Sequence, residues 1–173
     1  MDLARDVLTA VLWLGAGLLV YAGGTKLVVP DAAMAALHRL HLPSGRVAAR
    51  VLGLGEIAVG AVIVVAGGLV GAVVSLVTYL ALTGVSLHQR AAQVDCGCFG
   101  VRRYPIPKLH IAVDAGLAVV SLAAVAAPPL PLAEVGADAG VLALLAGAVL
   151  VATGVALVTA MTERAGLAEA ANL

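Results

Sequence analysis

The chain has 173 residues, of which 62% are hydrophobic and 12% are charged, and its ten basic and ten acidic side chains give a formal net charge of zero. A soluble domain is about half apolar and about a quarter charged. The composition therefore excludes an ordinary soluble domain and indicates an integral membrane protein, whose first partner is the lipid bilayer. The basic residues form no continuous stripe, so we expect no nucleic-acid partner.

Apolar runs that are long enough to cross a bilayer can be counted along the chain. A crossing takes roughly 20 mostly apolar residues as an α-helix. The runs lie at residues 7–29, 47–66, 69–88, 109–127 and 139–162. Residues 51–87 would be too long for one crossing as a single helix, so we expect the chain to reverse at Gly67 and Gly68.

This pattern predicts an all-α, polytopic membrane protein. Residues 1–127 would form a four-helix membrane domain, with a cysteine-containing loop at residues 89–108. Residues 128–173 would add a linker, a fifth C-terminal transmembrane helix and a short tail. The linker contains the sequence PPLP, which ends the fourth helix because proline cannot donate to the helix ladder.

The segment PDAAMAALHRLHLPSG, between the first two crossings, predicts a short helix at the membrane interface with Asp31 as its N-cap. His38 and His41 are three residues apart there and form either a metal pair or ordinary interfacial histidines. We favour the second interpretation, because no carboxylate or thiol lies close in sequence.

The basic residues are distributed unequally between the two sides of a five-crossing chain. Arg5 lies alone on the N-terminal side, and nine basic residues lie on the other side: Lys26, Arg39, Arg46, Arg50, Arg90, Arg102, Arg103, Lys108 and Arg164. The positive-inside rule therefore predicts a multi-pass protein of the cell membrane with the cysteine loop in the cytoplasm.

The only two cysteines lie in the polar stretch VDCGCFGVRRYPIPK, at residues 94–108. Cys96 and Cys98 flank Gly97, and a disulfide across one residue meets the usual geometry only with strain. A strained or exposed disulfide is easily reduced, which is typical of catalytic and labile bonds. Four cations lie near the cysteines in sequence and favour the thiolate: Arg90, Arg102, Arg103 and Lys108. The negative charge of Asp95 opposes this effect.

Two other interpretations of the cysteines stay open. They are either small apolar residues without chemistry, or metal ligands that bind Cu(I) or Zn(II) together with His88 or His110. A third hypothesis concerns the loops rather than the thiols: a non-catalytic subunit that docks a soluble enzyme on its basic loops, chiefly through Arg102 and Arg103.

Several ionisable groups lie within the predicted helices. His110 and Asp114 are four residues apart, share a helix face and either pass protons to a thiol or form a polar pair at the helix entry. Glu56 lies well inside the second crossing, where a charge is expensive and usually faces a partner or a cavity. A neutral Glu56 or an ion pair with Lys26 would remove that cost.

The third predicted crossing carries polar side chains within an apolar helix: Ser75, Thr78 and Tyr79. They either line a pocket for a quinone or a lipid, or bond to neighbouring helices, which is the more frequent use of such groups.

The sequence DCGCFG at residues 95–100, with a proline-containing loop and a further helix after it, resembles the methylamine-utilisation family MauE. The sequences AGGTKLVVP at 22–30 and VLGLGEIAVGAVIV at 51–64 resemble the related DoxX family. The resemblance covers about residues 7–127 and implies a DoxX-like four-helix bundle linked to redox and thiol metabolism.

MauE is linked to maturation of the disulfide-rich small subunit of methylamine dehydrogenase beside a thioredoxin-like partner, and DoxX relatives to sulfur-compound oxidation by quinone. By resemblance, Cys96 and Cys98 correspond to the family dithiol, and Lys26 and Glu56 to its membrane polar positions.

The leading hypothesis is therefore a membrane thiol-disulfide oxidoreductase in which Cys96, Cys98, His110, Asp114 and Glu56 are the site residues. Its expected partner is a thioredoxin-like protein or a small thiol, with a soluble redox enzyme and a membrane quinone as further expected partners.

Overall fold

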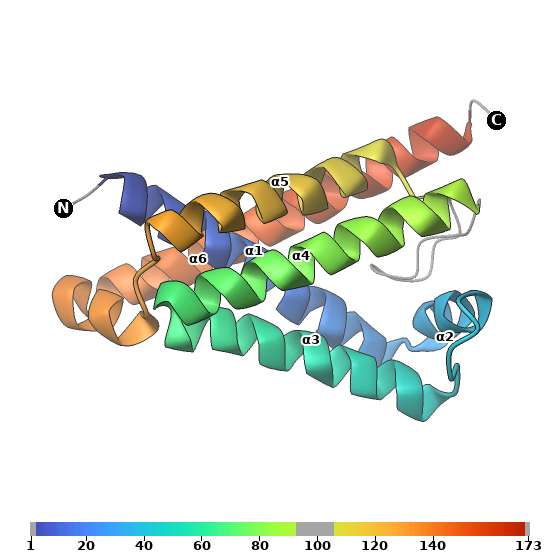
Figure 1. The fold of residues 1–173 in the computed structure, drawn as a ribbon, viewed down its shortest axis with the longest axis horizontal. Helices are drawn as coiled ribbons and strands as arrows, with labels where there is room; N and C mark the ends of the chain where they lie inside the picture. Colours follow the sequence, from blue (N-terminus) through green and yellow to red (C-terminus); the bar gives the residue numbers. More distant parts are fainter. Residues whose placement is uncertain (1–2, 93–105, 172–173) are drawn as a thin grey trace.

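The structure is a computed structural model that describes residues 3–92 and 106–171, and these residues form helices joined by short connections (Figure 1). The helices are α1 (Leu3–Val28), α2 (Asp31–Arg39), α3 (Arg46–Ala66), α4 (Gly68–Ala91), α5 (Lys108–Ala126) and α6 (Leu132–Ala170). Five of them, all except α2, are long and apolar enough to cross a membrane. The predicted all-α, multi-pass membrane fold is confirmed.

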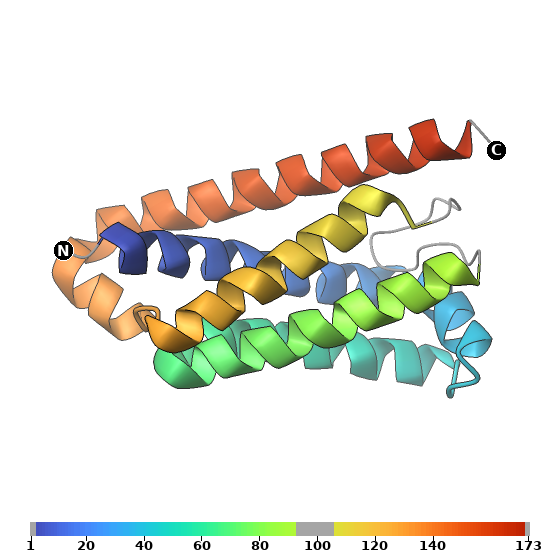
Figure 2. The same cartoon turned by 45° about the horizontal axis from the view of Figure 1, so that its top comes forward.

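The five long helices lie side by side and alternate in direction, so that the two termini are at opposite ends of the bundle (Figures 1 and 2). We call the C-terminal end the loop end: α1, α4 and α6 finish there, and α3 and α5 begin there. The short helix α2 also lies at this end (Figure 1). Residues 93–105, which contain both cysteines, connect α4 to α5 at the loop end.

The predicted reversal at Gly67 and Gly68 is confirmed. Both glycines have φ of 53°, a left-handed conformation that side chains rarely adopt. A Cβ on Gly67 would also lie 2.5 Å from Cα of Pro131, and the Gly68 N–H donates to the Pro129 carbonyl at 2.8 Å. The proline linker thus packs directly on the turn between α3 and α4.

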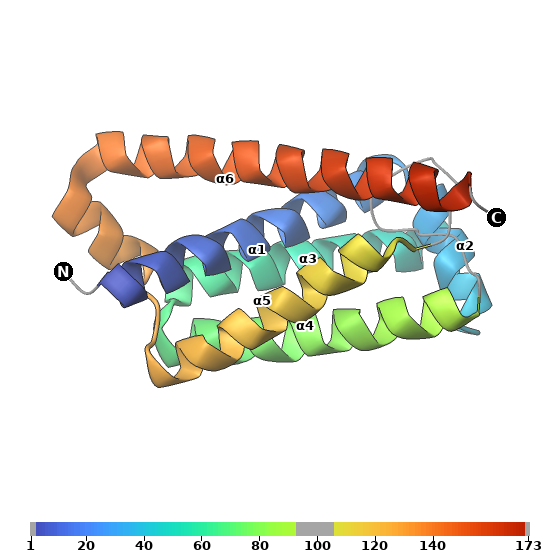
Figure 3. The same cartoon turned by 90° about the horizontal axis from the view of Figure 1, so that it is seen from above.

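The sequence-based bounds of the fifth crossing, residues 139–162, are wrong. The helix begins at Leu132, directly after the proline linker, and continues to Ala170. Gly140 interrupts it with φ of 72°, which sets a short first part at an angle to the long part (Figure 3). The stretch able to cross the membrane is Leu144–Glu169. A count of uncharged residues missed the C-terminal part of this stretch, because charged residues lie near its end.

Asp31 is not the N-cap of α2. Pro30 takes that position in a right-handed helical conformation, and its carbonyl accepts from the Met34 N–H at 2.9 Å. The helix therefore starts one residue earlier than the side chain of Asp31 suggested, and Asp31 is its first helical residue.

Close backbone contact joins α1 to α3, because small residues face each other across the pair. A Cβ on Gly23 would lie 2.4 Å from the Gly53 carbonyl oxygen, and one on Gly60 would lie 2.8 Å from the Ala16 carbonyl oxygen. Small residues at such a seam let two membrane helices approach until their backbones touch. This approach brings Lys26 on α1 within reach of Glu56 on α3.

The interior is formed by apolar side chains from all five long helices, such as Leu12, Ile63, Ala72, Leu117 and Val155. Many large apolar side chains face outward instead, among them Val62, Leu69, Val77, Leu122 and Leu150. An outward-facing apolar surface is expected where lipid rather than water is the solvent.

The polar side chains of α4 bond mainly to other helices. Ser75 and Ser121 hydroxyls are 2.8 Å apart, and the Tyr79 hydroxyl donates to the Gly15 carbonyl at 2.6 Å. Thr78 instead donates to the Val74 carbonyl of its own helix. The interpretation as interhelical bonds is therefore confirmed for Ser75 and Tyr79.

Candidate functional site

Cys96 and Cys98 lie outside the described residues, as do Arg102 and Arg103. The structure describes α4 and α5, the helices that precede and follow the cysteine-containing segment in the chain. The candidate site therefore consists of the buried polar groups that α1, α3, α4 and α5 present near the loop end.

The first polar group is an ion pair between α1 and α3. Lys26 Nζ lies 2.8 Å from Glu56 Oε2, and Nζ also donates to the Ala22 carbonyl at 3.3 Å. The two side chains are 5% and 13% exposed. Of the two expectations for Glu56, the structure has the ion pair, which removes the cost of a single buried charge.

The second polar group links α4 and α5. Asp114 Oδ2 lies 3.5 Å from His110 Nε2 and accepts a hydrogen bond from the Ser86 hydroxyl at 3.1 Å. All three residues are buried. The predicted i, i+4 pairing of His110 and Asp114 is confirmed, and the carboxylate is further fixed by a helix that sequence reasoning did not associate with it.

Both polar groups face one small cavity of about 30 Å³. Its walls include Lys26, Glu56, His110, Asp114 and the ring of Tyr79, with apolar side chains between them. A space of this volume accommodates a water molecule, provided that polar partners surround it. The structure thus brings two pairs that the sequence suggested separately into a single buried site.

Ser86 was missed by sequence reasoning, although a signal for it exists. Ser86 and Asp114 are equally far in sequence from residue 100. Two antiparallel helices joined by a connection pair their residues in this symmetric way, as α4 and α5 do. A search for polar residues placed symmetrically about the cysteine segment would have found the contact between Ser86 and Asp114.

The remaining histidines lie away from this cavity. His38, His41 and His88 are all exposed. Within residues 3–92 and 106–171, no three His, Cys, Asp or Glu side chains are grouped as metal ligands would be. A metal site that uses the cysteines stays a prediction, since its thiols lie outside these ranges.

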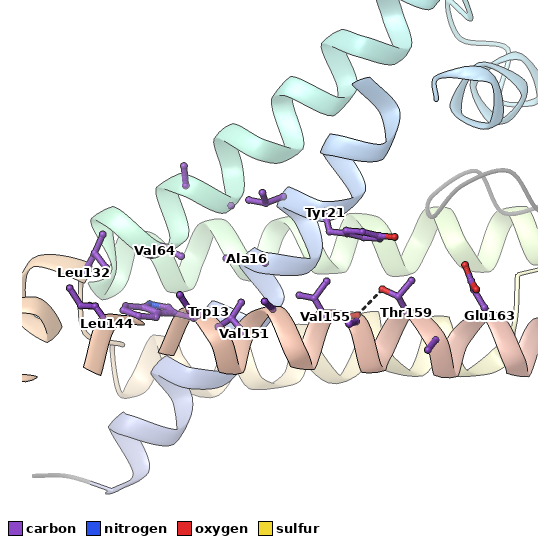
Figure 4. A pocket seen from close by; sticks show the side chains of 18 residues that line it. Trp13, Ala16, Tyr21, Val64, Leu132, Leu144, Val151, Val155, Thr159 and Glu163 are labelled. Carbon is purple, nitrogen blue, oxygen red and sulfur yellow. Dashed lines mark hydrogen bonds between the residues drawn. The ribbon is translucent and has the colours of Figure 1, made fainter. Parts of the chain in front are cut away.

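A second, separate cavity is a groove of about 880 Å³ between α1, α3 and α6 (Figure 4). Figure 4 shows Trp13 and Leu144 toward one end of the groove, and Tyr21 and Glu163 toward the other. Its volume is within the range of ligand pockets. Its walls are mostly apolar, however, and the four ionisable groups around the small cavity are not part of them. The chemistry of the site therefore belongs to the smaller cavity.

The family model described as methylamine utilisation protein MauE matches residues 4–127. This range contains helices α1 to α5, both cysteines and all four ionisable residues of the small cavity. No curated protein and no solved structure matches the chain.

Proposed function

The chain belongs to the MauE family of methylamine utilisation proteins, and we propose that it is a membrane thiol-disulfide redox protein in which Cys96 and Cys98 alternate between a dithiol and a disulfide. The resemblance to DoxX proteins stays a prediction. The proposal further assigns proton handling during thiol exchange to His110, Asp114 and Glu56.

One observation supports the proposal most strongly: four ionisable side chains share one buried cavity near the loop end. Ionisable groups inside a membrane are expensive and usually mark a functional path. His110 is the third residue of α5, the helix into which the cysteine segment leads. A buried proton acceptor so close in sequence to a dithiol fits thiol exchange better than packing.

The proposed reaction starts from the reduced protein and a disulfide partner. One cysteine thiolate attacks the partner disulfide, forming a mixed disulfide and releasing one partner thiolate. The second cysteine then attacks the mixed disulfide, so that the protein disulfide forms and the second partner thiolate leaves. Two electrons pass from the protein dithiol to the partner.

Proton transfer accompanies each attack. His110 takes the proton of the attacking thiol and returns it to the departing partner thiolate, while Asp114 orients the imidazole and stabilises its cationic form. Glu56 is the second proton acceptor, held in place by Lys26. The cavity gives both acceptors a common space, and Ser86 keeps the Asp114 carboxylate facing His110.

The partner belongs to the class of thioredoxin-like proteins or small thiols, and a soluble redox enzyme and a membrane quinone stay predictions. The side of the membrane is also part of the proposal. Lys26, Arg46, Arg90 and Lys108 lie at helix ends or in terminal turns at the loop end. The positive-inside rule therefore favours a cytoplasmic location for the cysteines.

The proposal is tested with the reduced protein in lipid nanodiscs and oxidised glutathione as the disulfide. We expect the wild type to form its internal disulfide with release of two glutathione thiols, and the Cys96→Ser, Cys98→Ser double variant to release none. A wild type that releases no glutathione thiol, or that stops at a mixed disulfide without forming its internal disulfide, would show the proposal to be wrong. Copper or zinc bound stoichiometrically to the reduced wild type, and lost in His110→Ala, would favour the metal-binding alternative instead.

A further inference from the structure

The carboxylate of Glu169, near the end of α6, contacts two other helices at the loop end. Its Oε2 accepts a hydrogen bond from Arg90 Nη1 of α4 at 2.9 Å. Its Oε1 accepts from the backbone N–H of Lys108, the first residue of α5, at 3.0 Å. A single side chain thus connects α6 to the last turn of α4 and to the first turn of α5.

Helix α5 needs an external acceptor at its start. The first N–H groups of any helix have no partner within that helix. The N-cap of α5 is Pro107, which has no side-chain hydrogen-bond acceptor to offer. Glu169 supplies a carboxylate there from another helix, and a negative charge at a helix N-terminus is also favoured by the helix dipole.

Arg90 makes the link to the cysteine segment. Its Nη1 donates both to Glu169 and to the carbonyl of Ile106, the first described residue after that segment. Arg90 lies two residues before Ala92, the last described residue before the segment. One guanidinium therefore holds the two sides of the connection together, and Glu169 fixes the guanidinium. The Arg90 and Glu169 side chains are 30% and 32% exposed, so the pair is partly shielded from solvent.

These contacts determine where His110 lies. His110 follows Lys108 by two residues, and its own N–H donates to the Pro107 carbonyl at 3.0 Å, within the turn that Glu169 caps. Helix α6 lies beyond residues 4–127, so the contact comes from outside the part of the chain that matches the family. The sequence predicted a linker, a fifth transmembrane helix and a short tail here, and no contact of this part with the cysteine-containing connection.

From this geometry we infer that Glu169 is a positioning residue of the redox site, which fixes the first turn of α5 and with it His110. The inference rests on the proposed function. Glu169 acts through Arg90 and through the Lys108 N–H rather than on the thiols themselves, so helix α6 completes a site whose chemical groups all lie on other parts of the chain.

The test compares Glu169→Ala and Glu169→Gln with the wild type in nanodiscs. Glutamine retains an oxygen that accepts from the Lys108 N–H but loses the charge that pairs with Arg90. Glu163→Gln, an identical change on the same helix, is the control. Two quantities are measured on each folded protein: hydrogen-deuterium exchange of the peptide covering the start of α5, and the rate of reaction with oxidised glutathione.

We expect Glu169→Ala to exchange its α5 amide hydrogens several-fold faster and to react with oxidised glutathione several-fold more slowly, with Glu169→Gln intermediate and Glu163→Gln unchanged. Unchanged amide exchange in Glu169→Ala would overturn the inference, because Glu169 would not hold the start of α5. Faster amide exchange with an unchanged or increased glutathione rate would overturn the positioning role. Failure of the proposed function appears separately, as a wild type that forms no internal disulfide with oxidised glutathione.

Discussion

At the scale of single residues, the buried ionisable side chains of α1, α3 and α5 that line the small cavity occur in pairs. Lys26 is 2.8 Å from Glu56, and His110 and Asp114 face each other across one turn of α5. A buried charge that loses its partner costs far more than the pair contributes, because the remaining group is left desolvated and uncompensated. Replacing one member of a pair is therefore expected to destabilise the protein through the other member.

Replacing Lys26 by Met should destabilise the protein by about 3 kcal/mol, because Glu56 loses its counter-ion in a buried place. The double variant Lys26→Met, Glu56→Gln should recover part of that loss, since no charge is then left alone. Thermal unfolding of the wild type, the two single variants Lys26→Met and Glu56→Gln, and the double variant in one detergent measures the difference. Strictly additive effects of the two substitutions would contradict an interaction between the side chains.

The hydroxyls of Ser75 and Ser121 allow a second test at this scale. Ser75→Ala and Ser121→Ala should each lower the stability of the protein by a similar amount, since either change removes the same interhelical hydrogen bond. A double-mutant cycle should give a coupling of about 0.6 kcal/mol, the average for such bonds in a membrane protein. A coupling of zero would mean that the two hydroxyls do not interact in the folded protein.

At the scale of elements, the seam between α1 and α3 positions the ion pair. Gly23 and Gly53 let the two backbones touch, and the reach of Lys26 to Glu56 depends on that distance. The adjacent Gly24 faces open space, with nothing near the position of a Cβ. Neighbouring glycines on one helix thus have different roles.

Gly23→Ala should destabilise the protein by about 2 kcal/mol, because the added methyl group overlaps the Gly53 carbonyl and forces the helices apart. Gly24→Ala is the matched control and should be neutral or slightly stabilising, since alanine favours the helix. Thermal unfolding measures both effects. Equal stabilities of the two variants would contradict the close approach of α1 and α3.

The number of membrane-spanning helices could be predicted from the sequence, but not all of their bounds. Hydropathy was sufficient for five crossings, because only the length and apolarity of each run matter, and Gly67 and Gly68 marked the reversal. The bounds of α6 could not be placed from counts of uncharged residues, because charged residues lie near both ends of the helix: Glu134 and Asp138 at the start, and Glu163, Arg164 and Glu169 at the end. Pairs within one helix, such as His110 and Asp114, follow from spacing alone.

The convergence of the two polar pairs on one cavity depends on how the helices rotate and slide against each other. No single helix encodes that arrangement. Glu169 is the clearest example, because its partners Arg90 and Lys108 come from two other helices. The site was therefore predictable as pairs of residues, and its assembly was not.

At the scale of the whole molecule, five alternating crossings place the N-terminus and the C-terminus at opposite ends of the bundle (Figure 3). Reporter domains fused to the two termini should therefore report opposite sides of the membrane, with the C-terminal reporter in the cytoplasm under the positive-inside rule. Activity-based reporters for the cytoplasm and the outside measure this. Both reporters on one side would exclude an odd number of crossings.

The most direct test of the redox proposal labels Cys96 and Cys98 in cells with a membrane-impermeant thiol reagent, before and after opening the cells and with or without prior reduction. We expect no labelling in intact cells. In opened cells, we expect the two cysteines to be labelled together and more strongly after reduction. The contradicting result is that opened cells label equally with and without reduction in every growth condition, and that no disulfide is detected. Cys96 and Cys98 would then not alternate between a dithiol and a disulfide.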